Sequence, residues 1–234
     1  MQLRLQVLAH CSAASNLTSI QGEYKVVTDC ENQQVHDWEE LMFLYRSALQ
    51  KMETKIGILN DEFQSFYNTN PIEHVKSRIK SAKSIAEKLR NLGYEDTIEN
   101  MEKHLTDVAG IRVICSFMSD VMVIAEKIKQ QEDVTVILVK DYMSKPKPNG
   151  YKSYHMVVTI PVYTRGKCVQ VPVEIQIRTI AMDFWASLEH KINYKYEGEM
   201  PENLINDLKE CADMVELLDK RMQFISASVL VSEE

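Results

Sequence analysis

V-E-I-Q-I-R-T-I-A-M-D-F-W-A-S-L-E-H-K-I-N-Y-K, at residues 173–195, is the stretch of sequence on which the fold depends. In its first half, β-branched residues occupy every second position and polar residues stand between them. Such alternation is typical of a β-strand that buries one of its faces. The other face carries an acid, an amide and a cation, which are Glu174, Gln176 and Arg178. We therefore expect a strand that presents charged groups to one side of a sheet.

After Thr179 the spacing of the apolar residues becomes helical. They recur along one stripe, formed by Ile180, Phe184, Leu188 and Ile192. Asp183 and His190 share a second face of the same helix, with Glu189 close to them. A charged strand that leads into a charged helix suggests a substrate site. The alternative, on this stretch alone, is a solvated sheet face beside a surface helix.

The composition favours a single domain of the α/β class with helical extensions. The chain has 234 residues, 45% of them hydrophobic, which is enough to bury a full core. No apolar run is long enough to cross a membrane, and the N-terminus is a poor signal peptide. The five scattered cysteines favour reduced thiols in the cytoplasm over disulfides or zinc. The net charge of −7 argues against general nucleic-acid binding, so we expect no DNA partner.

The chain divides into a short extension and one domain. Residues 1–35 lack clear periodicity, and we expect a loosely held N-terminal extension there. Residues 36–234 form the domain, which begins with a long amphipathic helix that ends before Pro71. A second long helix begins at about Pro201 and carries many acids. We expect it to pack on the N-terminal helix or on another subunit.

A basic segment follows the first helix. Within residues 73–80, Lys76, Arg78 and Lys80 occupy alternate positions, so three cations share one strand face. The helix expected over residues 82–91 adds further cations, including Lys88, and Glu87 is the single acid between Lys76 and residue 90. Converging cations of this kind suit a polyphosphate. The alternative is a solvated basic face.

Asp107 lies just ahead of a strand that we expect to begin at about Gly110. Carboxylates in this position commonly hold Mg²⁺ for phosphoryl transfer, because this ion needs only one or two protein carboxylates beside phosphate and water. Glu174 is the candidate for a second ligand. Arg112 points from the same strand, on the side opposite to its apolar residues.

A loop over residues 141–155 combines cations with aromatic rings. Lys147 and Lys152 flank the turn at Asn149-Gly150, and Tyr151 follows it. Lysine beside an exposed aromatic ring suits a nucleotide, whose phosphates pair with the lysine while its base stacks on the ring. The alternative is a hairpin whose tyrosines pack on the core, which we expect for Tyr154.

Four motifs in this order resemble the RelA/SpoT-homologue synthetases, and more specifically a stand-alone small alarmone synthetase. They are K-S-R-I-K-S (76–81), H-L-T-D-V-A-G-I-R-V (104–113), K-P-N-G-Y-K-S-Y-H (147–155) and residues 173–191 of the opening stretch. The resemblance covers residues 36–225, and the run at residues 70–78 is similar to the RelP-like branch. It implies an α/β (α+β) fold: a nucleotidyltransferase-like mixed sheet of about five strands flanked by helices, with long N- and C-terminal helices.

The resemblance implies a Mg²⁺-dependent GTP pyrophosphokinase, without a hydrolase domain. Such an enzyme transfers the pyrophosphate of ATP to the ribose 3′-hydroxyl of GDP or GTP, which gives ppGpp or pppGpp and AMP. By the resemblance, the ATP site comprises Arg78, Lys80, Lys88 and Arg112, and the catalytic, Mg²⁺-holding pair is Asp107 and Glu174. The GDP or GTP site comprises Lys147, Tyr151, Lys152, His155, Gln176, Asp183 and Glu189, with Tyr151 stacked on guanine.

The resemblance also implies a homo-oligomer, since relatives of this size are often homotetramers, whereas RNA binding is not indicated. Two alternatives stay open. A nucleotidyltransferase of the same fold would want clustered acids, often as D-x-D, and the sequence has no such motif. A non-catalytic regulator that binds guanine nucleotide or RNA would tolerate the loss of Asp107 or Glu174, yet both are present.

Overall fold

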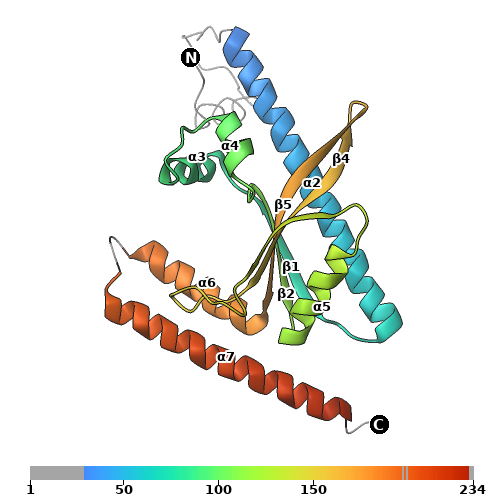
Figure 1. The fold of residues 1–234 in the computed structure, drawn as a ribbon, viewed down its shortest axis with the longest axis vertical. Helices are drawn as coiled ribbons and strands as arrows, with labels where there is room; N and C mark the ends of the chain where they lie inside the picture. The colour runs from blue at the N-terminus through green and yellow to red at the C-terminus, as the bar shows by residue number, and fades with distance from the viewer. Residues whose placement is uncertain (1–28, 197, 199, 232–234) are drawn as a thin grey trace, which may run out of the picture.

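The computed structural model describes residues 29–196, 198 and 200–231 of the chain. Its helices and strands alternate along most of this length (Figure 1). In chain order they are α2 (Asp29–Tyr67), β1 (Ile72–Ile79), α3 (Ala82–Asn91), α4 (Ile98–His104), β2 (Ala109–Cys115), α5 (Met118–Lys129), β3 (Thr135–Asp141), β4 (Tyr154–Thr164), β5 (Lys167–Thr179), α6 (Ile180–Lys195) and α7 (Glu202–Val231). The predicted α+β class, with a long helix at each end of the described chain, is confirmed.

The five strands form one mixed sheet in the order β1-β2-β5-β4-β3. Only the central pair, β2 and β5, is parallel; the other neighbours are antiparallel. β4 and β5 form a long hairpin whose turn places Arg165 and Gly166 in the left-handed region, at φ 47° and 74°. The opening stretch of the sequence therefore supplies the strand that joins both halves of the sheet.

One face of the sheet carries the main core, because α2 and α5 lie over it (Figure 1). The inward residues of β5, Val173, Ile175 and Ile177, are fully buried there with Met52 and Ile56 of α2. α6 and α7 lie on the other side of the sheet, where Tyr151 and Trp185 belong to a smaller apolar cluster. The polar face of β5 therefore lies between α3 and α4 at one end of the sheet and α6 and α7 at the other.

Two expectations about the terminal helices need correction. The first helix begins at Asp29, so it extends into what the sequence suggested was the N-terminal extension; residues 1–28 lie outside the described residues. Within the chain, the last helix, α7, packs mainly against α6 and α5 and not on the N-terminal helix; the other alternative, a contact with another subunit, stays a prediction. The apolar stripe of α6 is also exposed, and the residues of α6 that face inward are Met182, Trp185 and Ala186.

No helix within the described part of the chain has both the length and the apolar character that a membrane span requires. The cysteines whose side chains are described, Cys115, Cys168 and Cys211, are free thiols.

Candidate active site

Strand register gathers the predicted polar residues into rows across one face of the sheet. One row crosses four strands and consists of Lys76, Arg112, Gln176 and His155. In the adjoining row, Arg78 of β1 and Glu174 of β5 flank Gly110 of β2. Because Gly110 has no side chain, the space above it stays open. A cavity of about 260 Å³ lies there, lined by residues of both rows and by Asp107.

Asp107 lies at the entrance to β2 and is held by two lysines. Its Oδ2 accepts hydrogen bonds from Nζ of Lys80 at 2.5 Å and from Nζ of Lys88 at 2.6 Å. Burial acts to raise the pKa of Asp107, but the two lysines outweigh it and leave the pKa below its usual value. Its other oxygen, Oδ1, is buried and has no hydrogen-bond partner among the described residues.

Glu174 is the second carboxylate of the cavity, on the neighbouring strand. Its Oε2 accepts a hydrogen bond from Nε2 of Gln176 at 2.9 Å, and its Oε1 lies 3.6 Å from Nδ1 of His155. Burial acts to raise the pKa of Glu174, yet the contacts with His155 and Gln176 leave it below its usual value, and the charge of Asp107 works against them. Glu174 is therefore ionised at neutral pH.

These two carboxylates fit a magnesium ion. An unpaired, buried carboxylate oxygen such as Oδ1 of Asp107 is a costly arrangement unless a cation or donor joins it. Mg²⁺ prefers oxygen ligands and needs one or two protein carboxylates, with phosphate and water completing its shell. The described residues hold no cluster of three or more His, Cys, Asp or Glu side chains, so a dedicated all-protein cage is absent from them.

A second charged cluster lies where β5 enters α6. Oδ1 of Asp183 accepts hydrogen bonds from Nη1 of Arg178 at 3.0 Å and lies 3.2 Å from Nη1 of Arg112. Arg178 also donates through Nη2 to Oη of Tyr151 at 2.6 Å and to Oε1 of Gln176 at 3.0 Å. The sequence pattern placed Arg178 on the polar face without assigning it a role. The structure makes it the link between the sheet and the loop that follows β3.

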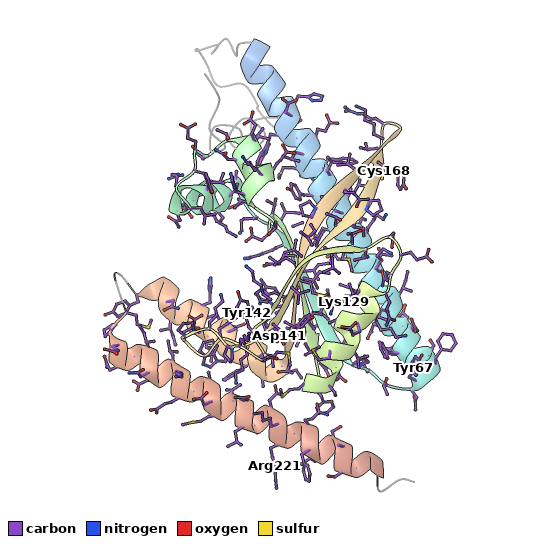
Figure 2. The ribbon with its side chains drawn as sticks, in the orientation of Figure 1. Tyr67, Lys129, Asp141, Tyr142, Cys168 and Arg221 are labelled. Atoms are coloured by element: carbon purple, nitrogen blue, oxygen red, sulfur yellow. The ribbon has the colours of Figure 1, made fainter. Side chains whose placement is uncertain are left out.

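That loop, here the β3–β4 loop (residues 142–153), places Tyr151 over the polar face. The hydroxyl of Tyr151 is hydrogen-bonded to Nε2 of His155 at 2.8 Å, and its ring packs edge-on against Tyr142, which Figure 2 labels. Nζ of Lys147 lies 4.8 Å from the centroid of the Tyr151 ring, within cation–π distance. Tyr154 is buried in the main core, as predicted.

Two predicted residues lie apart from both the cavity and the hydrogen bonds of Arg178. The ammonium of Lys152 is paired with Glu216 of α7 and borders a separate apolar pocket. Glu189 accepts hydrogen bonds from the amides of Asn149, at 3.0 Å, and Asn193. Glu189 therefore braces the turn of the β3–β4 loop from α6.

The predicted donor residues thus converge, and so do most of the acceptor residues. Arg78, Arg112, Asp107, Glu174 and Gln176 line one cavity. Lys80 and Lys88 reach it through Asp107. The remaining predicted residues, apart from Lys152 and Glu189, join the same face through the hydrogen bonds of Arg178 and the loop: Asp183, Tyr151, His155 and, over the Tyr151 ring, Lys147.

Comparison with known proteins finds relatives that cover most of the chain. A family described as "Region found in RelA / SpoT proteins" matches residues 77–199. The chain is 46% identical to the GTP pyrophosphokinase YwaC of Bacillus subtilis over 83% of this chain and 93% of that protein. The crystal structure of small alarmone synthetase 2 from Bacillus subtilis superposes with a TM-score of 0.74 at 44% identity, over 82% of this chain and 99% of that one.

Small alarmone synthetase 1 from Bacillus subtilis, solved with its product pppGpp, superposes with a TM-score of 0.76 at 36% identity, over 82% of this chain and 98% of that one. The matched segment begins within β1 and ends just beyond α6, so it contains the β3–β4 loop and every residue of the two rows and the cavity except Lys76. The chain belongs to the RelA/SpoT family, as the four sequence motifs suggested.

Proposed function

We propose that this chain is a GTP pyrophosphokinase. It transfers the β,γ-pyrophosphate of ATP to the ribose 3′-hydroxyl of GDP or GTP and releases ppGpp or pppGpp together with AMP. One observation supports this most: a carboxylate held by two lysines faces a second carboxylate across a cavity lined with arginine. Phosphoryl-type transfer asks a protein mainly for such positioning and charge neutralisation.

On the donor side, Lys80 and Lys88 bind the phosphates of ATP, and Arg78 and Arg112 hold the adenine. A polyphosphate carries more negative charge than the single carboxylate that the two lysines share in this structure. We therefore expect their ammonium groups to move part of their hydrogen bonding from Asp107 to phosphate oxygens.

Asp107 and Glu174 would hold the metal. When bound, Mg²⁺ neutralises charge on the phosphoryl oxygens during transfer. Glu174 also lies ready to accept the proton of the attacking hydroxyl, because it is ionised and its Oε1 is near His155. Its lowered pKa makes it a weak base, so orientation of the two substrates, which contributes about 7–11 kcal/mol in favourable cases, carries more of the acceleration.

On the acceptor side, Tyr151 stacks on guanine and Lys147 pairs with the acceptor's phosphates. In this structure the ammonium of Lys147 occupies the neighbourhood of the Tyr151 ring. Its departure to a phosphate would open one approach of the base to the ring, which is only 9% exposed in this structure and which the guanidinium of Arg178 also contacts, with Cζ 5.1 Å from the ring centroid. His155, Gln176, Asp183 and Glu189 complete the pocket, the first three through the network around Arg178.

The exposed apolar residues of α6 and α7 support assembly with further copies of the chain, and we propose a homotetramer. Phe184 of α6 is 60% exposed and Leu217 of α7 is 70% exposed, within a run of exposed apolar residues along both helices. The apolar stripe of α6 would then be buried between subunits. Light scattering on the purified protein, compared with the Leu217→Glu variant, tests this: a wild type with the mass of one chain contradicts it.

Exposed free thiols at Cys168 and Cys211 suit a reducing compartment, and we place the protein in the cytoplasm.

The reaction is tested by incubating the purified protein with Mg²⁺, ATP and GDP and separating the products by anion exchange. We expect guanosine tetraphosphate with an equal amount of AMP. ADP or free pyrophosphate in their place would indicate a different transferase. No turnover, with tight binding of guanine nucleotide, would indicate the regulator that the sequence left open.

A further inference from the structure

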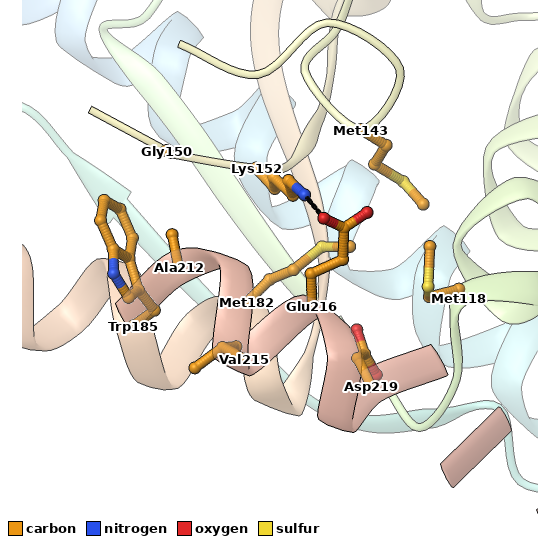
Figure 3. A pocket seen from close by; sticks show the side chains of 10 residues that line it. All are labelled: Met118, Met143, Gly150, Lys152, Met182, Trp185, Ala212, Val215, Glu216 and Asp219. Carbon is orange, nitrogen blue, oxygen red and sulfur yellow. Dashed lines mark ion pairs between the residues drawn. The ribbon is translucent and has the colours of Figure 1, made fainter. Parts of the chain in front are cut away.

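The β3–β4 loop rests on α7 at two adjoining points, outside the cavity that holds Asp107. Figure 3 shows Gly150 and Lys152 of the loop beside Ala212 and Glu216 of the helix. The pocket between them has a volume of only about 20 Å³. That is room for about one water molecule, so this region is a packed contact and not a ligand site.

The first point is steric. Gly150 has a φ of +89°, and a Cβ placed on it would lie 2.6 Å from Cβ of Ala212 and 3.4 Å from Cα of Lys209. Such approaches leave no space for a side chain, and the positive φ also favours glycine. The backbone of the loop is therefore pressed directly against α7.

The second point is an ion pair. Glu216 accepts from Nζ of Lys152 through one oxygen and from Nζ of Lys220 at 2.8 Å through the other. The side chain of Lys152 is 12% exposed and that of Glu216 is 27% exposed, so water competes little for the contact. The hydrogen bonds from Lys152 and Lys220 lower the pKa of Glu216, which keeps it charged.

α7 is itself fastened to the rest of the protein without Glu216. Nε1 of Trp185 donates to the carbonyl of Leu208 at 2.9 Å, and Oγ1 of Thr179 donates to Oδ2 of Asp219 at 2.6 Å. The helix is thus a fixed support, attached to α6 and to the end of β5.

We propose that Glu216 is a positioning residue for the acceptor nucleotide: through Lys152 it holds the β3–β4 loop against α7, so that Tyr151 is in place before the nucleotide arrives. The inference rests on the proposed function, because that function assigns GDP or GTP to the β3–β4 loop. Ordering a loop when the ligand binds costs conformational entropy, and a loop that is already held avoids that cost. Releasing it should therefore raise the acceptor KM and leave ATP binding alone.

The test compares Glu216→Gln with Glu210→Gln, a matched control at an exposed position of the same helix. We expect Glu216→Gln to raise the KM for GDP about tenfold or more, the scale of losing one charge-assisted hydrogen bond. The KM for ATP and kcat should stay within about twofold of the control. A GDP KM equal to that of Glu210→Gln would overturn the proposal.

Ala212→Val disrupts the steric contact, because it adds two methyl groups where the backbone of Gly150 packs against α7. Amide hydrogen exchange should become faster across residues 142–153 in both Glu216→Gln and Ala212→Val, with α7 still protected and the Glu210→Gln control unchanged. Unchanged loop exchange in both variants would overturn the proposal. Because hydrogen exchange needs no turnover, it tests the loop contact even if the wild type makes no ppGpp, a result that would refute the proposed function separately.

Discussion

Replacing Asp107 with asparagine tests the centre of the site. The change keeps the shape of the side chain but removes the negative charge that Lys80 and Lys88 share. Lys88 is 41% exposed and can turn to water, whereas Lys80 is 11% exposed and cannot. Asp107→Asn therefore leaves one buried ammonium group without its counter-ion, which is the expensive half of a broken buried pair.

The expected loss follows from that one lysine. A hydrogen bond to a charged group contributes about 1.5–3 kcal/mol, so the free energy of unfolding should fall by about this amount. For a protein of this size the melting temperature then falls by roughly 3–12 °C. The free energy of unfolding of native domains is about 5–15 kcal/mol, so the variant should still fold at room temperature. Its synthesis rate should fall by about 100-fold or more, the scale of removing one preorganised electrostatic contact.

Thermal unfolding followed by circular dichroism measures the fall in melting temperature, and the anion-exchange assay measures the fall in synthesis rate. The double variant Asp107→Asn/Lys80→Met is the control, because it removes the stranded ammonium group as well and should regain part of the lost stability. An Asp107→Asn variant that melts like the wild type would refute the buried pair. One that keeps more than about a tenth of the activity would refute the metal assignment.

Three further changes test the rest of the arrangement. Tyr151→Ala should raise the acceptor KM about tenfold or more, since base stacking contributes about 1–3 kcal/mol, and an unchanged value in initial-rate measurements would exclude the stacking role. Lys80→Ala should raise the KM for ATP more than that for GDP; the reverse result would mean that the donor and acceptor sites are exchanged. Burial raises the pKa of Asp219; the charge of Glu216 also raises it, and the hydrogen bond from Thr179 acts in the opposite direction. The folded protein therefore binds this proton more tightly than the unfolded chain does, and it loses stability as the pH rises through the pKa of the folded state. Asp219→Asn should thus raise the melting temperature at neutral pH but not below about pH 3.9, where the acid is protonated in both states, and a variant that is less stable at neutral pH would contradict the raised pKa.

Local patterns predicted the strands and the polar face well because they depend on neighbours in sequence. The alternation in residues 173–178 fixes which side chains of β5 face the core, and the register with β2 then aligns Glu174 with Gly110 and Gln176 with Arg112. The same alternation put Arg178 on the polar face, but its partners Tyr151 and Asp183 come from other elements. Its role could be recognised only after those elements were placed.

The sequence pattern does not predict the start of α2, for a different reason. Residues 29–35 are mostly polar and show no apolar periodicity, so the pattern gave no signal there. Glutamate and glutamine are nevertheless good helix formers, and extending an existing helix costs far less than nucleating one. Propensity next to a strongly amphipathic helix would have been the better guide to this boundary.

Tertiary packing determines which face of α6 is buried within the chain, and the sequence pattern alone does not. The stripe at Ile180, Phe184 and the positions beyond is a regular amphipathic signal, but periodicity identifies an apolar face without naming its partner. Within this chain α7 covers the face that carries Trp185, and the predicted stripe points outward. The pairing of Lys152 with Glu216 depends on the same docking of α7, so no local pattern could have predicted it.

The charges of the site explain how an acidic chain keeps a cationic cavity folded. Lys80 and Lys88 share Asp107, Arg112 and Arg178 share Asp183, and Glu174 lies beside His155. Within the protein, each of these charged groups is paired with a single carboxylate or imidazole. A ligand with one negative charge gains little binding free energy by replacing such a partner, because the ion pair within the protein is broken at the same time. A di- or triphosphate brings several charges at once and can satisfy the cations that it takes from the carboxylates. These ion pairs therefore select for polyphosphates, and monophosphate nucleotides should bind much more weakly than ATP or GDP.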